Sequence, residues 1–150
     1  MLNMRNQTRH ERRRRLRAVC VSPDGARDWG PVRFDEALVE PECMANLVRL
    51  SLAPDGGKNR ILFSNHDNAR SRERKNVTIK LSYNEGETWP VQKALERGRS
   101  GYSDLAVTPD GTILCSHERG SFGKDHMNAA HLCVARFNLE WLTDGRDRLP

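Results

Sequence analysis

Tyr102 is the residue whose type and setting most directly suggest chemistry. It follows Gly101 in a glycine-bearing segment, and the hairpin that comes after it ends at the carboxylate of Glu118. A phenol has a pKa of about 10, so it becomes a nucleophile at neutral pH only beside a carboxylate that accepts its proton and cations that stabilise its anion. Taken by itself, such a tyrosine is more often one that packs where a strand begins.

Arginines are the second group of residues with chemical potential. The chain has 25 Lys and Arg against 20 Asp and Glu, a net charge of +5. This balance suits an anionic ligand, and a guanidinium group matches a carboxylate with two parallel hydrogen bonds. It suits nucleic acid or a membrane surface equally well, so the charge alone selects no partner.

A run of arginines from Arg12 to Arg15 resembles a nucleic-acid or nuclear-targeting patch. It lies between two strand-like segments, and neither an aromatic platform nor a recognition helix accompanies it. We therefore interpret the run as a solvated hairpin loop and expect no nucleic-acid partner.

The cysteines and histidines do not form a metal-binding pattern. Cys20, Cys43, Cys115 and Cys133 include no Cys-x-x-Cys pair, and each lies in or beside an apolar run. Buried free thiols are the favoured interpretation, with disulfides or a zinc site as alternatives. The five histidines show no ligand spacing with them, so we expect no metal and no cofactor.

The elements that must position these side chains are short strands joined by tight turns. Proline, aspartate and glycine mark several turns, such as Pro23-Asp24-Gly25 and Pro109-Asp110-Gly111. The strands are predicted at residues 1–6, 16–22, 32–34, 47–52, 60–64, 77–83, 89–95, 104–107, 112–116 and 131–138. No convincing helix is predicted, and residues 139–150 are expected to be a polar tail. The pattern indicates an all-β meander.

A repeat divides this meander. Segments 22–29 and 82–89 share a serine, an Asx residue and a tryptophan at identical offsets, 60 residues apart. The Asx side chain can accept backbone N–H groups across a turn, and the tryptophan can pack between neighbouring sheets. Four-stranded units that recur at such a period are typical of the blades of a β-propeller.

The second copy resembles the Asp-box of sialidases, with asparagine in place of the aspartate. Its matching residues are Ser82, Asn84, Gly86, Thr88 and Trp89. Together with Ser100-Gly-Tyr102 and the hairpin that ends at Glu118, it makes most of the chain similar to the C-terminal portion of the sialidase (neuraminidase) catalytic domain. The resemblance implies that residues 1–150 form part of a six-bladed β-propeller, about two and a half to three blades, and that the boxes are structural.

The same resemblance implies an exo-α-sialidase, a glycoside hydrolase that removes terminal sialic acids with retention. Tyr102 would be the nucleophile, because the carboxylate of sialic acid repels an approaching Asp or Glu whereas a phenol is neutral. Arg17 and Arg74 would bind that carboxylate, with Arg15 and Arg72, two residues away, as alternatives. Glu118 would brace the first arginine of the family's triad.

The acid/base aspartate, the glutamate that activates the tyrosine and the first arginine belong to the family's N-terminal portion. We therefore expect this chain to be inactive without the N-terminal half of the propeller, and we expect sialylated glycoconjugates as substrates. The alternative function is a non-catalytic propeller that binds acidic glycans or a protein partner. No apolar run approaches the roughly 18 residues of a membrane span, no signal peptide is recognised, and the sequence indicates no compartment.

Overall fold

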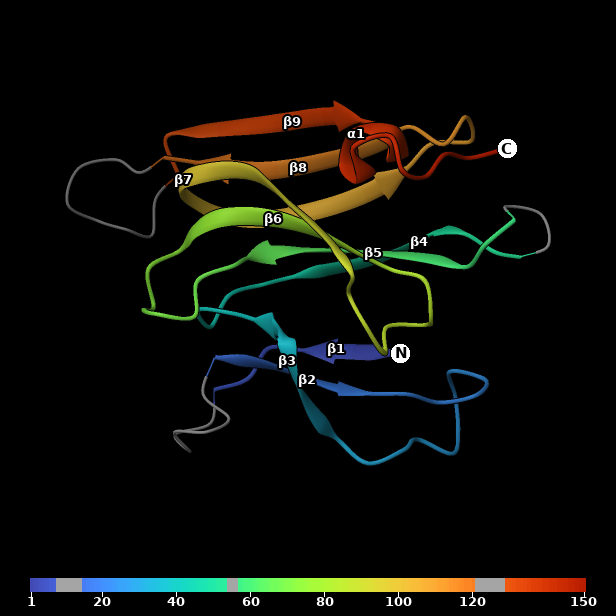
Figure 1. The fold of residues 1–150 in the computed structure, drawn as a ribbon. Helices are drawn as coiled ribbons and strands as arrows, with labels where there is room; N and C mark the ends of the chain where they lie inside the picture. Colours follow the sequence, from blue (N-terminus) through green and yellow to red (C-terminus); the bar gives the residue numbers. More distant parts are fainter. Residues whose placement is uncertain (8–14, 54–56, 121–128) are drawn as a thin grey trace.

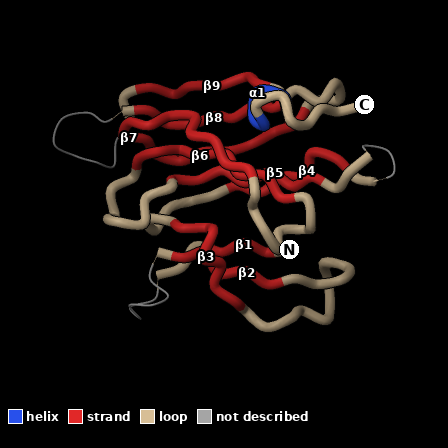
Figure 2. The backbone as a smooth tube through the Cα atoms, viewed as in Figure 1, coloured by secondary structure: helices blue, strands red, loops and turns tan. Residues whose placement is uncertain are grey.

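The computed structural model describes residues 1–7, 15–53, 57–120 and 129–150, and the statements below concern these ranges. Ten elements follow one another, nearly all of them strands (Figure 2). Their bounds are β1 Leu2–Met4, β2 Leu16–Cys20, β3 Arg33–Val39, β4 Asn46–Ser51, β5 Arg60–His66, β6 Lys75–Ser82, β7 Val91–Val107, β8 Ile113–Arg119, β9 His131–Phe137 and α1 Leu139–Thr143.

The strands form two antiparallel sheets in which each strand pairs with the next one along the chain. Strands β1, β2 and β3 make a three-stranded sheet, and β4 to β9 make a six-stranded sheet in sequential order. Figure 1 shows the smaller sheet below the larger one, with the N-terminus between them. Short connections favour this arrangement, because antiparallel neighbours need only a turn between them. The predicted all-β meander is confirmed.

Strand β7 pairs with two different strands along its length. Its first part pairs with β6, up to the pair Lys75↔Arg99, and its second part pairs with β8, from Ser100↔Arg119 onward. The register shifts on both sides of this changeover, and Figure 1 shows the strand bending there. The sequence predicted separate strands at 89–95 and 104–107; the chain instead remains extended between them as it exchanges one partner strand for the other.

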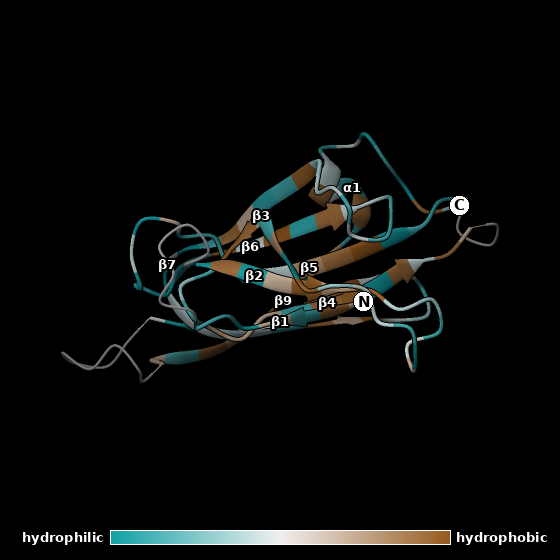
Figure 3. Cartoon of the chain, turned by 90° about the horizontal axis from the view of Figure 1, so that it is seen from below, coloured by the Kyte–Doolittle hydropathy of each residue, from teal (hydrophilic) through white to brown (hydrophobic). Residues whose placement is uncertain are grey.

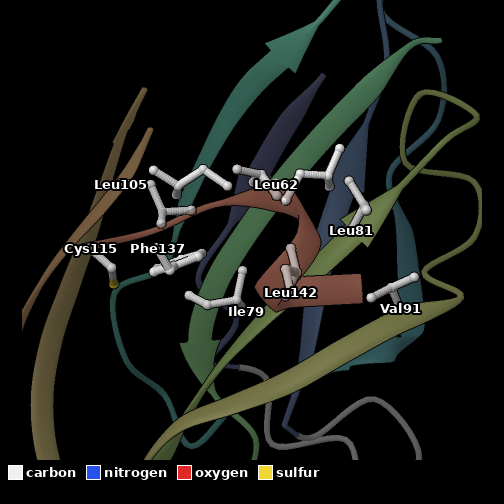
Figure 4. Close-up of a cluster of buried hydrophobic side chains, with 10 residues drawn as sticks. Leu62, Ile79, Leu81, Val91, Leu105, Cys115, Phe137 and Leu142 are labelled. Carbon is white, nitrogen blue, oxygen red and sulfur yellow. The ribbon is translucent and has the colours of Figure 1, made fainter. Parts of the chain in front are cut away.

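Two hydrophobic clusters stabilise the sheets. The larger cluster joins β5 to β9 with the C-terminal segment; Figure 4 shows Leu62, Ile79, Leu81, Leu105 and Phe137 among its members. The smaller cluster joins the two sheets and contains Val19, Leu38, Ile61, Phe63 and Trp89. Figure 3 shows the matching distribution of hydropathy, with hydrophobic residues mainly in the strands and hydrophilic ones in the connections.

The segment predicted as a polar tail is a structured part of the core. Asn138 caps helix α1 by accepting a hydrogen bond from the backbone N–H of Trp141, and Leu139 and Leu142 are buried in the larger cluster. Beyond the helix, the carboxylate of Asp147 lies 2.8 Å from both Nε and Nη2 of Arg60 on β5. The predictions of a polar tail and of no helix are therefore wrong for residues 139–147.

The box at 82–89 forms a turn held by its own side chains. Oγ of Ser82 accepts the N–H of Gly86 at 2.9 Å, and Oδ1 of Asn84 accepts the N–H of Thr88 at 2.9 Å. Gly86 has a φ of 83°, a backbone conformation that favours glycine. Trp89 packs on Phe63, with 5.6 Å between the ring centroids, and so connects the turn to the smaller cluster. Asparagine thus performs the acceptor function for which the pattern uses aspartate.

The first copy of the repeat makes the same kind of turn. Ser22 accepts the N–H of Gly25 at 2.9 Å, and Asp24 accepts the N–H groups of Ala26 and Arg27, each at 2.9 Å. Its tryptophan, Trp29, is partly exposed and belongs to neither hydrophobic cluster. Both copies therefore form turns held by their serine and Asx side chains, although the serine accepts the N–H three residues on in the first copy and four residues on in the second.

In the part of the chain that the structure describes, no helix is long and apolar enough to span a membrane. Within the same residues, no group of three or more His, Cys, Asp or Glu side chains has the arrangement of a metal site. The four cysteines are free thiols; Cys20, Cys43 and Cys115 are buried, as predicted, and Cys133 is partly exposed.

Candidate functional site

Tyr102 lies on β7 just after the strand changes partners. The residue is 42% exposed. Its backbone N–H donates a 2.8 Å hydrogen bond to Oε2 of Glu118, the penultimate residue of β8. The fit around the preceding residue is close, because a Cβ atom on Gly101 would lie 1.7 Å from the same oxygen. Glu118 therefore fixes the backbone that carries the phenol, and glycine at 101 makes room for its carboxylate.

Arg74 covers the ring of Tyr102. Its guanidinium carbon lies 5.4 Å from the ring centroid, a cation–π contact. Arg74 ends the connection between β5 and β6, and its carbonyl oxygen accepts the N–H of Ser100 at 3.1 Å, so backbone and side chain both bind this connection to β7. Tyr102, Glu118 and Arg74, predicted from widely separated parts of the sequence, are thus brought together by the structure.

Arg17 occupies a different setting. It lies on β2 and is only 2% exposed. Its Nη1 donates to Oε2 of Glu40 and to the carbonyl oxygen of Cys43, each at 2.9 Å, and its other donors reach Asn3. Burial lowers the pKa of Arg17, and the charge of Glu40 acts in the opposite direction. The structure therefore places Arg17 in a buried ion pair, without direct contact to the ring of Tyr102.

Cys43 connects the two arginines in space. Arg17 bonds its carbonyl oxygen, and the positive charge of Arg74 acts on its thiol. Burial nevertheless dominates and raises the pKa of the Cys43 thiol. Arg15 and Arg72, the alternative candidates for binding the substrate carboxylate, have other partners. Arg15 donates a hydrogen bond to the carbonyl oxygen of Ala69, and Arg72 forms an ion pair with Glu42. Of the arginine run, Arg12 to Arg14 lie outside the described residues.

Two clefts adjoin the Tyr102–Arg74 contact, one lined by Arg74 and the other by Tyr102. One of about 490 Å³ is lined by Ser71, Arg72, Glu73, Arg74, Arg99, Ser100 and Gly120. The other, of about 420 Å³, includes Tyr102 and Glu118 with the apolar side chains of Met44, Leu132 and Val134. One cleft is therefore basic and the other largely apolar, with the phenol on the apolar one and the guanidinium on the basic one.

His66 was not anticipated from the sequence. It ends β5 with an exposure of 0%, and neither ring nitrogen has a hydrogen-bond partner among the described residues. Burial is the main cause and the charge of Arg74 the second cause that lower the pKa of His66 to about 4. The backbone groups of Ser100 and Gly101 favour a higher pKa but do not outweigh these two causes. A neutral imidazole thus lies under the segment that carries Tyr102.

Glu40 was also missed. It is completely buried, accepts the backbone N–H of Asn6 at 2.8 Å and holds Arg17. A single glutamate before Pro41 gives no sequence signal of either role, because nothing local distinguishes it from a solvent-exposed charge in a loop.

Comparison with known proteins identifies relatives of one kind. A sialidase of Micromonospora viridifaciens is 35% identical over 145 residues, which is 95% of this chain and 20% of that protein. A sialidase of Bacteroides fragilis (strain YCH46) is 36% identical over 124 residues, 79% of this chain and 21% of that protein. The chain thus spans about a fifth of the length of these curated relatives. No family model matches it.

Solved structures agree with this result. A Hadza microbial sialidase is 30% identical, with a TM-score of 0.67 over 93% of this chain and 25% of that one. The NanB sialidase of Streptococcus pneumoniae has a TM-score of 0.72 at 16% identity, over 86% of this chain and 21% of that one. The intramolecular trans-sialidase of Ruminococcus gnavus has a TM-score of 0.69 at 23% identity, over 85% and 29%. The latter two likenesses show the fold alone. Sequence and fold together identify the chain as part of a β-propeller of the sialidase-like family.

Proposed function

We propose that this chain carries the nucleophile and part of the substrate-binding site of a retaining exo-α-sialidase. The observation that carries the proposal is the arrangement of Tyr102: a partly exposed phenol with the guanidinium of Arg74 over its ring and its backbone N–H bonded to Glu118. The relatives in sequence are sialidases, which supports sialylated glycoconjugates as the substrate class.

In the proposed reaction, Oη of Tyr102 attacks the anomeric carbon of a terminal sialic acid. A bond forms between the phenol oxygen and that carbon, the glycosidic C–O bond breaks, and the leaving oxygen takes a proton from a general acid. Water then attacks the same carbon and returns the phenol, so two inversions give retention. The base that deprotonates the phenol and the acid that protonates the leaving group are assigned to the N-terminal half of the propeller.

Arg74 is the proposed ligand of the substrate carboxylate, because its guanidinium lies next to the phenol and lines an open cleft. Arg17 is only 2% exposed and gives four of its five N–H donors to Glu40, Cys43 and Asn3. We therefore propose that Arg17 acts from behind the site, as a buried positive charge in the same neighbourhood, and that Glu118 positions the tyrosine backbone.

The test joins this chain to the N-terminal portion of a related sialidase and measures cleavage of an aryl α-sialoside. We expect the chain alone to show no turnover and the joined protein to show it. Tyr102→Phe should lower the rate by about a hundredfold or more, because the nucleophile is removed. Tyr83→Phe is the matched control, since Tyr83 is the other tyrosine of the chain and lies outside both clefts.

Full activity of the Tyr102→Phe protein would refute the assigned nucleophile. Binding of sialosides by a joined protein that never turns them over would favour the non-catalytic alternative.

A further inference from the structure

The basic cleft contains more positive charge than one carboxylate needs. Three of its lining side chains are arginines, Arg72, Arg74 and Arg99, and one is a carboxylate, Glu73. Arg72 and Arg74 come from the connection between β5 and β6, and Arg99 comes from the changeover of β7. Figure 1 shows both of these segments on the same side of the molecule. The cleft therefore gathers guanidinium groups from two separate parts of the chain.

Two of the three guanidinium groups are oriented by carboxylates and are accessible to a ligand. Nη2 of Arg72 lies 2.6 Å from Oε1 of Glu42, and Nε of Arg99 lies 3.4 Å from Oε1 of Glu73. Their side chains are 63% and 43% exposed. An ion pair of this kind limits where the side chain can lie, while the exposed part of the guanidinium remains accessible to a further anion.

The third guanidinium connects this cleft to the proposed reaction. Arg74 lines the cleft and covers the ring of Tyr102. If Arg74 holds the carboxylate of the sialic acid that is cleaved, the Arg72 and Arg99 side chains lie beyond that sugar, in a space of about 490 Å³ that extends from it. Among the described residues, no aromatic side chain lines this space to stack on a neutral sugar ring. Its composition is that of an anion-binding surface.

We propose that the basic cleft binds a second anionic group of the glycan, next to the sialic acid, through Arg72 and Arg99. The preferred substrates would then be acidic beyond their terminal sialic acid. The second anion could be the carboxylate of an adjoining sialic acid or a sulfate ester on a neighbouring sugar, because a guanidinium binds both. This inference rests on the proposed function and specifies its substrate class.

The test uses the joined protein described above, as its Tyr102→Phe variant so that no probe is cleaved, and measures its affinity for three probes by titration calorimetry at low salt. They are a methyl α-sialoside with one anion, an α2,8-linked disialoside with two carboxylates, and a sulfated sialyl-lactose. Each added anion should tighten binding by about three- to tenfold, as expected for charge-assisted hydrogen bonds at partly exposed groups. The gain should shrink as salt is added, because exposed charges are screened. A gain for only one of the two larger probes would identify the source of the second anion.

Variants assign this gain to particular residues. Arg72→Gln and Arg99→Gln should abolish most of the gain and leave the affinity for the methyl sialoside nearly unchanged. Arg70→Gln and Arg97→Gln are the matched controls, because both arginines are exposed neighbours that do not line the cleft, and they should preserve the gain.

Equal affinities for all three probes, or a gain that survives in the Arg72→Gln and Arg99→Gln proteins, would overturn the second anion site and leave the proposed function intact. If the methyl sialoside fails to bind at concentrations where Arg74 should hold it, the proposed function itself is overturned.

Discussion

Lowering the pH from about 7.5 to about 5 should destabilise the folded chain through His66. This imidazole is completely buried at the end of β5, and its pKa is lowered from 6.5 to about 4. Burial is the main cause, and the charge of Arg74 is the second. Between these two pKa values the unfolded chain binds a proton that the folded chain does not, so acid favours unfolding.

The size of the effect follows from the shift. Each pKa unit corresponds to about 1.4 kcal/mol, so the shift from 6.5 to about 4 amounts to about 3 kcal/mol when complete. At pH 5 the free energy of unfolding is already about 2 kcal/mol lower because of His66. Above about pH 7.5 the imidazole is neutral in both the folded and the unfolded chain, and this loss is absent. The carboxylates whose pKa values are lowered, among them Glu73, Glu85 and Asp147, start from 4.5 or 3.8 and lose their contributions mainly below this window.

The assay is urea unfolding at several pH values between these limits, followed by tryptophan fluorescence. The wild-type free energy of unfolding should fall toward pH 5, and in His66→Gln this slope should largely disappear. Arg74→Gln should reduce it, because the second cause of the shift is removed. His131→Gln is the control, since His131 is exposed on β9, and its slope should equal that of the wild type. An unchanged slope in His66→Gln would refute the reasoning.

Three further predictions concern the core and the tyrosine segment. Asp147→Asn should lower the free energy of unfolding by about 3 kcal/mol in urea titrations, because it leaves the buried charge of Arg60 without its ion pair; a loss below about 0.5 kcal/mol would contradict this. Trp89→Ala should cost about 3 to 5 kcal/mol in the same assay, since the ring connects the two sheets, and a neutral result would argue against that packing. Gly101→Ala should displace Glu118 and speed hydrogen exchange of the Tyr102 amide about tenfold or more, whereas Gly98→Ala should not; equal exchange in both would show that the carboxylate does not hold that amide.

The strands and turns were predictable because their signals are local. Pro-Asp-Gly turns, alternating apolar runs and the Asx residues Asp24 and Asn84 determine the backbone over a few residues, and the structure contains the corresponding elements. Helix α1 was missed because its five residues are too few for helical periodicity; the signal present was the cap at Asn138 with Leu139 and Leu142 three residues apart.

The non-local parts of the site could not be predicted in the same way. The continuity of β7 was hidden by Gly98 and Gly101, which usually indicate a loop, whereas pairing with β6 and then with β8 keeps the segment extended. The burial of His66 and Glu40 depends on strands distant in sequence, and no neighbouring residue records it. The family resemblance supplied Tyr102, Glu118 and Arg74 as residues of one site, but it predicted neither the contacts of Tyr102 with Glu118 and Arg74 nor the enclosure of Arg17 by Glu40.

Because β7 pairs first with β6 and then with β8, insertions and deletions within it affect both pairings. Successive side chains of a strand point to opposite faces, so inserting or deleting one residue reverses every side chain on one side of the change. Within Val91–Val107 such a change cannot be confined to one group of strands, because the residues that leave β6 at Arg99 join β8 at Ser100. A single-residue insertion between Gly98 and Gly101 would turn the phenol of Tyr102 away from its cleft or shift the whole hairpin behind it. This segment should therefore accept substitutions at its exposed positions while its length stays fixed.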